Sequence, residues 1–136
     1  RCVVISDGYY EWKRYGDSKK PFYIHHPEHK LLLMAGLWTS WGSSSDLIST
    51  YTVITTTPQK RIAHIHDRMP VILKRSQVDN WIRPSKGNKI PTQLDYLRPF
   101  VGKLICHPVS NFVNSTGNNN MKCIKPTDET NELSLF

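Results

Sequence analysis

The sequence has 136 residues, of which 38% are apolar, a length that suits one domain with its own core. The longest apolar run, residues 31–38, is far shorter than the roughly 20 residues that a membrane-spanning helix needs. No secretory signal is visible, so we expect a nuclear or cytoplasmic protein. Because the chain begins at Arg1, we also expect a fragment, a processed product or an incomplete gene model.

The chain is basic. Its formal net charge is +7, and the three carboxylates after Lys125 leave about +10 (7 plus 3) on the residues before them. Basic residues are paired at Lys19-Lys20, Lys60-Arg61 and Lys74-Arg75. Together with four Trp and six Tyr, this charge favours a polyanionic partner, and single-stranded nucleic acid in particular, because bases stack on aromatic rings. The alternative is a basic protein that binds no polyanion.

The three cysteines, Cys2, Cys106 and Cys123, are widely spaced and form no Cys-x-x-Cys motif. This pattern argues against a disulfide framework and against a structural zinc site. His64-Ile65-His66 could supply two ligands to a metal. A zinc site needs a third protein ligand, and Cys106-His107 is the only other cluster of suitable residues in the sequence. We therefore expect neither a metal nor another cofactor.

Short apolar or β-branched runs, separated by turn residues, predict strands along most of the chain. Cys2–Ser6 and residues 9–13 are predicted to form a hairpin around Asp7-Gly8. Further strands are predicted in residues 21–24, 31–38, 49–56, 69–73 and 101–112. The predicted fold is α+β, with a largely antiparallel, barrel-like mixed sheet and a few short helices.

Three short helices are predicted from capping patterns. Thr57-Pro58 is expected to begin one that runs through Ala63, while Ser76-x-x-Asp79 and Thr92-x-x-Asp95 are expected to begin the other two. The domain is expected to span residues 1–125, and residues 126–136 are expected to form a disordered tail.

The stretch from Ala63 to Leu73 concentrates groups that could do chemistry, with two imidazoles, a carboxylate and a guanidinium within five residues. On an extended backbone His64 and His66 would share one face, and Ile65 and Asp67 the other. The alternative is an exposed polar loop. Arg68 could hold a phosphate, or it could pair with Asp67.

Glu11 lies between two aromatic residues on a predicted strand. Alternation places Tyr10 and Trp12 on one face and Glu11 on the other. If the face of Glu11 is covered, desolvation raises its pKa and suits it to proton transfer. If Tyr10 and Trp12 point inward instead, Glu11 is an ordinary solvated carboxylate.

Two segments read Asp7-Gly8-Tyr9-Tyr10-Glu11-Trp12-Lys13 and His64-Ile65-His66-Asp67-Arg68-Met69-Pro70. Together with residues 1–4, 21–24, 35–38, 51–55 and 107–114, they resemble the SOS-response-associated-peptidase family, and its eukaryotic, 5-hydroxymethylcytosine-binding branch most closely. The resemblance implies binding to single-stranded DNA and covalent capture of abasic sites by an N-terminal cysteine as a thiazolidine. It implies a monomer without cofactors.

The resemblance also assigns roles to particular residues. Glu11 and His66 match the catalytic glutamate and histidine, Arg68 matches a DNA-contacting arginine, and Thr55 matches a threonine near the pocket. The family begins Met-Cys-Gly-Arg, whereas Cys2 falls where the family has an interior strand residue. The nucleophile is therefore expected to be absent from this chain. The alternatives are a non-catalytic module for single-stranded or modified DNA and, third, a peptidase.

Overall fold

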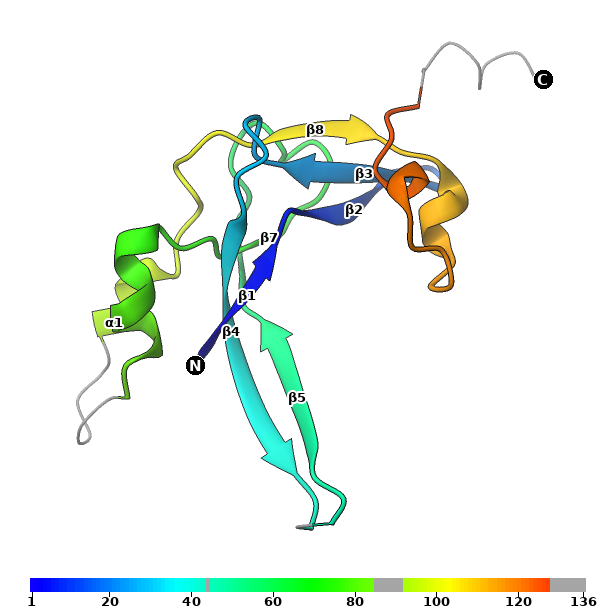
Figure 1. The fold of residues 1–136 in the computed structure, drawn as a ribbon. Coiled ribbons are helices and arrows are strands. Elements are labelled where there is room, and N and C mark those ends of the chain that lie inside the picture. The colour runs from blue at the N-terminus through cyan, green and yellow to red at the C-terminus, as the bar shows by residue number, and fades with distance from the viewer. Residues whose placement is uncertain (44, 85–91, 128–136) are drawn as a thin grey trace, which may run out of the picture.

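The computed structural model describes residues 1–43, 45–84 and 92–127 (Figure 1). Within these ranges the strands are β1 (Cys2–Ser6), β2 (Gly8–Tyr15), β3 (Ser18–His25), β4 (Leu32–Trp41), β5 (Ile48–Val53), β6 (Thr55–Thr56), β7 (Met69–Pro70) and β8 (Ile105–Pro108). The helices are α1 (Val78–Ile82) and the 3-10 helices η1 (Arg75–Gln77), η2 (Thr92–Tyr96), η3 (Asn111–Asn114) and η4 (Met121–Cys123). None of the helices in these ranges is long and apolar enough to cross a membrane.

The strands form two three-stranded sheets, in the orders β1-β4-β5 and β2-β3-β8, and β6 pairs with β7 in a small third sheet. Every strand pair is antiparallel. The α+β prediction with a largely antiparallel sheet is therefore confirmed. The predicted barrel-like closure is not seen, because the described strands stay in separate sheets that cross one another (Figure 1).

The predicted hairpin between the first two strands is wrong. β1 pairs with β4, and β2 pairs instead with β3. Only Asp7 separates the end of β1 from the start of β2, and hairpin loops usually need two or more residues. The chain therefore bends at Asp7 from one sheet into the other, and the Ser6 hydroxyl donates a hydrogen bond to the carbonyl of Gly8 at this corner.

Other predicted boundaries also shift. β4 continues through Gly36 to Trp41, and the predicted strand over residues 49–56 is split at Ile54. Ile54 leaves the β4–β5 ladder register because its amide donates to Ala35 and its carbonyl accepts from Val71. The predicted helix from Thr57 to Ala63 is wrong, since residues 60–65 form consecutive turns.

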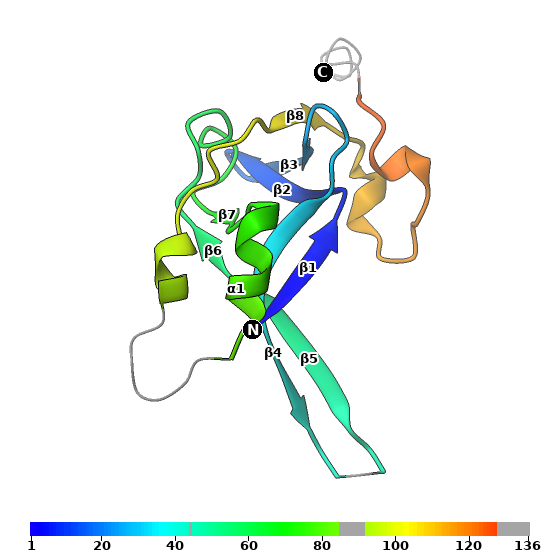
Figure 2. The same ribbon diagram turned by 60° about the vertical axis from the view of Figure 1, so that its left-hand side comes forward.

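The core lies between the sheets and under the loop that joins β6 to β7. Its larger cluster consists of the buried residues Phe22, Ile24, Leu32, Met34, Ile62, Ile65, Met69, Ile72 and Leu104. A second cluster joins Ala35, Val71, Leu73 and Trp81, which attaches α1 to the β1–β4 sheet (Figure 2). The indole of Trp81 also donates a hydrogen bond to the Cys2 carbonyl, 2.8 Å away.

The two remaining predicted helices are shorter than their patterns suggested. At the first, Gln77 rather than Asp79 completes the cap, because its side-chain oxygen accepts the Lys74 amide at 2.7 Å. At the second, only the 3-10 helix η2 forms. Two residues of the predicted tail have partners: Pro126 bridges to Val109, and the Thr127 amide donates to the Pro108 carbonyl. Residues 128–136 lie outside the described residues.

The β4–β5 hairpin extends away from the two clusters (Figures 1 and 2). Its Trp38, Trp41 and Tyr51 side chains are exposed, although Trp38 and Tyr51 are direct partners across the two strands. Cross-strand aromatic pairs stabilise a hairpin only modestly. The outer half of this hairpin therefore adds little to the buried core.

Gly8 gives a test of the packing at the corner. A Cβ on Gly8 would lie 2.5 Å from the ring of Tyr23, which is itself buried against neighbouring rings. Replacing Gly8 with alanine is expected to lower the free energy of unfolding by about 1–3 kcal/mol through overpacking. Chemical denaturation measures this change. In the matched variant Gly117→Ala, the added Cβ meets only the Ser115 hydroxyl, 3.9 Å away, so little change in stability is expected. Equal losses of stability in the two variants would contradict overpacking at Gly8.

Candidate active site

Glu11 lies on β2, on the face of the strand that turns toward the core. Tyr9, two residues earlier, packs against the larger core cluster, and alternation along β2 gives Glu11 the same face. Tyr10 and Trp12 take the opposite face, where Tyr10 packs against Tyr23 and the Trp12 indole donates to Asn114 at 2.9 Å. Of the two alternatives left by the sequence, the structure therefore shows the covered glutamate. The Glu11 side chain is 21% exposed.

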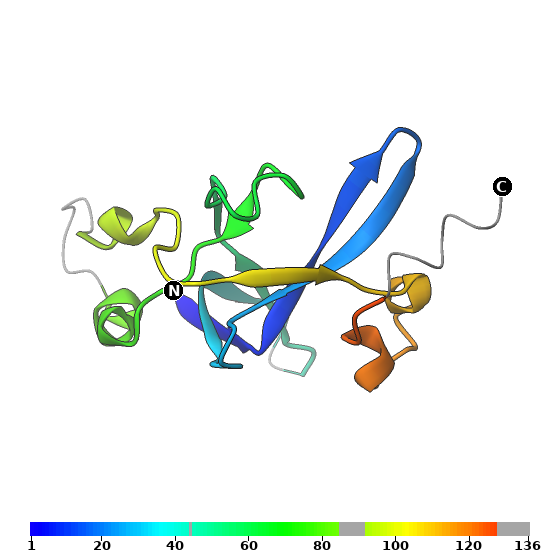
Figure 3. The same ribbon diagram turned by 90° about the horizontal axis from the view of Figure 1, so that it is seen from above.

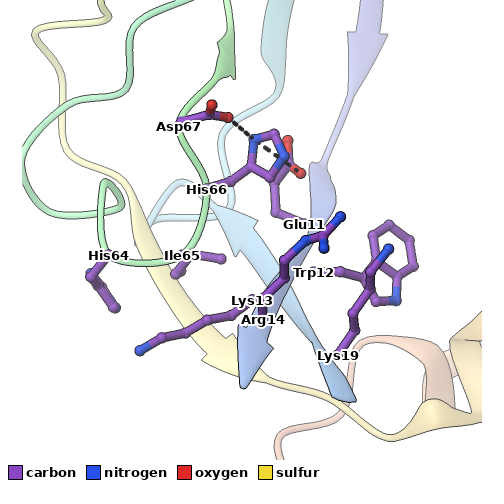
Figure 4. A pocket seen from close by; sticks show the side chains of 9 residues that line it. All are labelled: Glu11, Trp12, Lys13, Arg14, Lys19, His64, Ile65, His66 and Asp67. Carbon is purple, nitrogen blue, oxygen red and sulfur yellow. Dashed lines mark ion pairs between the residues drawn. The ribbon is translucent and has the colours of Figure 1, made fainter. Parts of the chain in front are cut away.

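His66 reaches Glu11 from the loop between β6 and β7 (Figure 4). The buried side chains of Ile62, Ile65 and Met69 anchor this loop on the core. Of the two alternatives for residues 64–67, the structure shows the loop rather than an extended segment, with turns at 64–65 and a bend at Asp67. Nδ1 of His66 lies 3.8 Å from Oε2 of Glu11 and 3.3 Å from Oδ1 of Asp67.

The same nitrogen has partners for both protonation states of the imidazole. The backbone amide of Arg68 lies 3.1 Å from Nδ1 and can donate to it when the ring is neutral. The carbonyl of Arg68, 3.3 Å away, and the Asp67 carboxylate can accept from a protonated Nδ1. At 3.8 Å Glu11 is too far for a direct hydrogen bond but close enough for an ion pair. The loop therefore holds an imidazole that can take up and release a proton beside Glu11.

Burial raises the pKa of Glu11 above its ordinary value. A protonated His66 opposes this shift, while the negative charge of Asp67 adds to it. Burial is the largest of the three causes, so Glu11 holds a proton to higher pH than an exposed glutamate does. A carboxyl group tuned in this way can act as an acid or a base nearer neutral pH.

Arg68 points to Thr55 rather than to Asp67. Its Nη2 donates to the Thr55 carbonyl at 2.7 Å and to the Thr55 hydroxyl at 2.9 Å, and its Nε lies 3.2 Å from the same hydroxyl. The sequence proposed a pairing of Arg68 with Asp67 as one alternative, and the Thr55 contacts replace it. These contacts tie the loop that carries His66 to β6, so Arg68 and Thr55 position His66.

A cavity of about 660 Å³ opens beside the Glu11–His66 pair (Figure 4). Its lining residues are Glu11, Trp12, Lys13, Arg14, Lys19, His64, Ile65, His66 and Asp67. Acid–base groups and cations therefore border one hollow. Within the described ranges, no group of three or more His, Cys, Asp or Glu side chains is placed to hold a metal ion, and His64 and His66 form no such site.

The sequence singled out four site residues, and the structure brings them together in two contacts, Glu11 with His66 and Arg68 with Thr55. The sequence did not identify Asp67 as a partner of His66, because that contact depends on the bend of the backbone at Asp67. It also missed that Lys13, Arg14 and Lys19 border the same cavity. The basic pair Lys19-Lys20 was visible in the sequence, but its distance from His66 was not.

The raised pKa of Glu11 has a consequence for stability. Below the ordinary pKa of glutamate, Glu11 is protonated in both the folded and the unfolded state. Its contribution to the free energy of unfolding is then fully present. As the pH rises through the raised folded pKa, folded protein must bury a charge and stability is lost. Glu11→Gln is therefore expected to raise the free energy of unfolding relative to wild type more at about pH 8 than at about pH 4.

Denaturant unfolding at the two pH values measures this difference. Glu28→Gln is the matched control, because a hydrogen bond from Lys30 lowers the pKa of Glu28 and gives the opposite sign. That variant is expected to gain no stability at the higher pH. If the free energy of unfolding of Glu11→Gln equals that of wild type at both pH values, burial does not raise the pKa of Glu11.

The sequence matches the family described as SOS response associated peptidase (SRAP) over residues 1–116. It is 36% identical over 146 residues to the Xenopus tropicalis protein named abasic site processing protein HMCES, covering 91% of this chain and 42% of that protein. It is 34% identical over 132 residues to the Bacillus subtilis abasic site processing protein YoqW, covering 92% and 57%.

A solved structure of a Bacteroides thetaiotaomicron protein has the same fold. It superposes with a TM-score of 0.78 at 26% identity, over 92% of this chain and 56% of that one. The chain thus spans about half the length of the relatives that it matches.

Proposed function

Because this chain belongs to the SOS response associated peptidase family, we propose that the protein containing it captures abasic sites in single-stranded DNA. The names of the similar frog and bacterial proteins, abasic site processing proteins, support this substrate. The observation that carries the proposal is the approach of His66 to Glu11, 3.8 Å apart, at the edge of a basic cavity.

An abasic site offers a sugar that must be opened from its ring form to an aldehyde before an amine can attack it. The amine nitrogen then bonds to the aldehyde carbon, and the carbonyl oxygen leaves as water after gaining protons. Each of these steps moves a proton at oxygen or nitrogen. Glu11, with its raised pKa, and His66, with partners for both protonation states, are suited to supply and remove those protons.

The proposed nucleophile is an N-terminal cysteine whose amine and thiol close on the aldehyde carbon to form a thiazolidine. Cys2 of this chain does not meet that requirement, because its nitrogen is already in the peptide bond to Arg1. It also lies on β1, where its sulfur would sit 2.9 Å from a Cβ at Gly36. The contribution of this chain is therefore the acid–base pair and the DNA surface.

The test uses the parent protein, meaning the longest translated product that contains this chain. It is incubated with a single-stranded oligonucleotide that carries one abasic site and, separately, with the undamaged oligonucleotide. A denaturing gel is expected to show a slower covalent band with the abasic strand only. Cys2→Ser is expected to leave that band intact.

Two outcomes would overturn the proposal. Loss of the band in Cys2→Ser would place the nucleophile within this chain, contrary to the geometry of β1. Absence of any covalent band, with binding to single strands retained, would leave a non-catalytic module for single-stranded or modified DNA as the better account. A peptide-hydrolysis assay on unrelated substrates is expected to show no activity.

A further inference from the structure

The β2–β3 hairpin carries an unusual set of cross-strand neighbours near its turn. Lys13 lies directly opposite Lys20, and Arg14 lies directly opposite Lys19. Like charges in opposed positions of an antiparallel pair destabilise it. The two pairs lie on opposite faces of the hairpin, and like charges repel within each pair unless an anion lies beside it.

The described part of the protein does not provide that anion to three of these side chains. Lys13, Arg14 and Lys19 form no ion pair with any described residue. Lys13 lies over the ring of Tyr15, with its Nζ 5.0 Å from the ring centre, which does not neutralise its charge. Arg14 and Lys19 are exposed to solvent.

The same three cations border the cavity that contains Glu11 and His66. Figure 4 shows Arg14 and Lys19 extending on the side of Trp12, while Lys13 leaves the hairpin in the other direction. Figure 3 shows the hairpin projecting from the body of the protein beside the loop between β6 and β7. A polyanion that entered the cavity would therefore pass along the hairpin.

Arg68 is less free to serve as the main anion contact, because its guanidinium donates to both oxygens of Thr55. Lys13, Arg14 and Lys19 have no comparable acceptor among the residues that the structure describes. This difference separates two kinds of basic residue around the cavity, one that fixes the loop and one that is available to a ligand.

We propose that the hairpin holds phosphates of the DNA strand next to the captured site, with Arg14 and Lys19 reaching them from one face of the hairpin and Lys13 from the other. The ligand class is a single-stranded phosphodiester backbone, and the contacts carry no sequence information, since they touch no base edge. This inference rests on the proposed function for the identity of the anion. It adds the hairpin to Arg68 as an electrostatic contact with the strand.

The test measures the affinity of the parent protein for an undamaged, fluorescently labelled single strand over a range of salt concentrations. Each phosphate contact contributes about −0.7 to the slope of log K against log salt for single strands. The variant K13Q/R14Q/K19Q is therefore expected to bind with a slope shallower by about 2 (three contacts) than wild type. The charge-conserving variant K13R/R14K/K19R is expected to keep the wild-type slope.

The matched control is K74Q/R75Q/R83Q, which removes the same formal charge from exposed residues before and after α1. A hairpin variant with the wild-type slope, or a control variant that loses as much slope, would overturn the inference. The undamaged strand keeps this test separate from the proposed chemistry. If covalent capture fails and the slope still falls, only the proposed function is contradicted.

Discussion

Replacing Glu11 with glutamine is expected to slow the formation of the covalent product by about 10²–10⁴-fold, the usual contribution of a positioned acid or base. Glutamine keeps the size and the hydrogen-bonding oxygen of the side chain but cannot exchange a proton. Affinity for an undamaged single strand is expected to stay near that of wild type, because Glu11 adds a negative charge rather than a phosphate contact. Single-turnover kinetics on a denaturing gel, with binding measured separately, give both quantities.

Glu28→Gln is the matched control for that experiment, since Glu28 is an exposed carboxylate that pairs with Lys30 outside the cavity. It removes the same charge and is expected to leave the rate unchanged. A Glu11→Gln protein that reacts at the wild-type rate would show that Glu11 does not transfer protons in this reaction. A rate loss that is matched by an equal loss of affinity would assign Glu11 to binding.

Replacing His66 with alanine is expected to reduce the same rate by about 10²–10⁴-fold. The substitution removes the imidazole that lies between the Glu11 and Asp67 carboxylates. It also opens a space at the cavity wall, so imidazole added to the solution is expected to restore part of the rate. Such a rescue reports a missing proton carrier, which a purely structural role would not produce.

His26→Ala is the control for this second prediction, because His26 does not line the cavity and bonds to the amide of Glu28 instead. It is expected to react normally and to show no response to imidazole. A His66→Ala protein with a normal rate would contradict the assignment. If the variant is slow and imidazole does not help, His66 positions the loop instead of carrying a proton.

The fold was predictable where the pattern of a segment depends only on its near neighbours in sequence. β1 was predicted within its observed bounds, and β3 lies close to its predicted position, because both contain short continuous apolar runs bounded by turn residues. The pairing of β1 with β4 was not predictable, since the short corner at Asp7 looked like a hairpin turn. The helix expected after Thr57 failed because Ile62 and Ile65 are held by the core in turns.

The candidate site was also predictable only where its features depend on near neighbours in sequence. Alternation along β2 correctly separated Glu11 from Tyr10 and Trp12, but the burial that decides its chemistry comes from the packing of Tyr9 and the approach of the His66 loop. That approach joins residues 55 positions apart in the chain (66 minus 11), which no local pattern encodes. The resemblance to a family named both residues, and the structure supplied their distance.

Glu11 and His66 are expected to act as one acid–base unit, and the double variant E11Q/H66A tests this most directly. Groups that act as a unit have non-additive effects on rate. The double variant is therefore expected to react at about the rate of the slower single variant when single-turnover rates are compared on the abasic strand. If the two single losses multiply in the double variant, the residues act independently and the claim is contradicted.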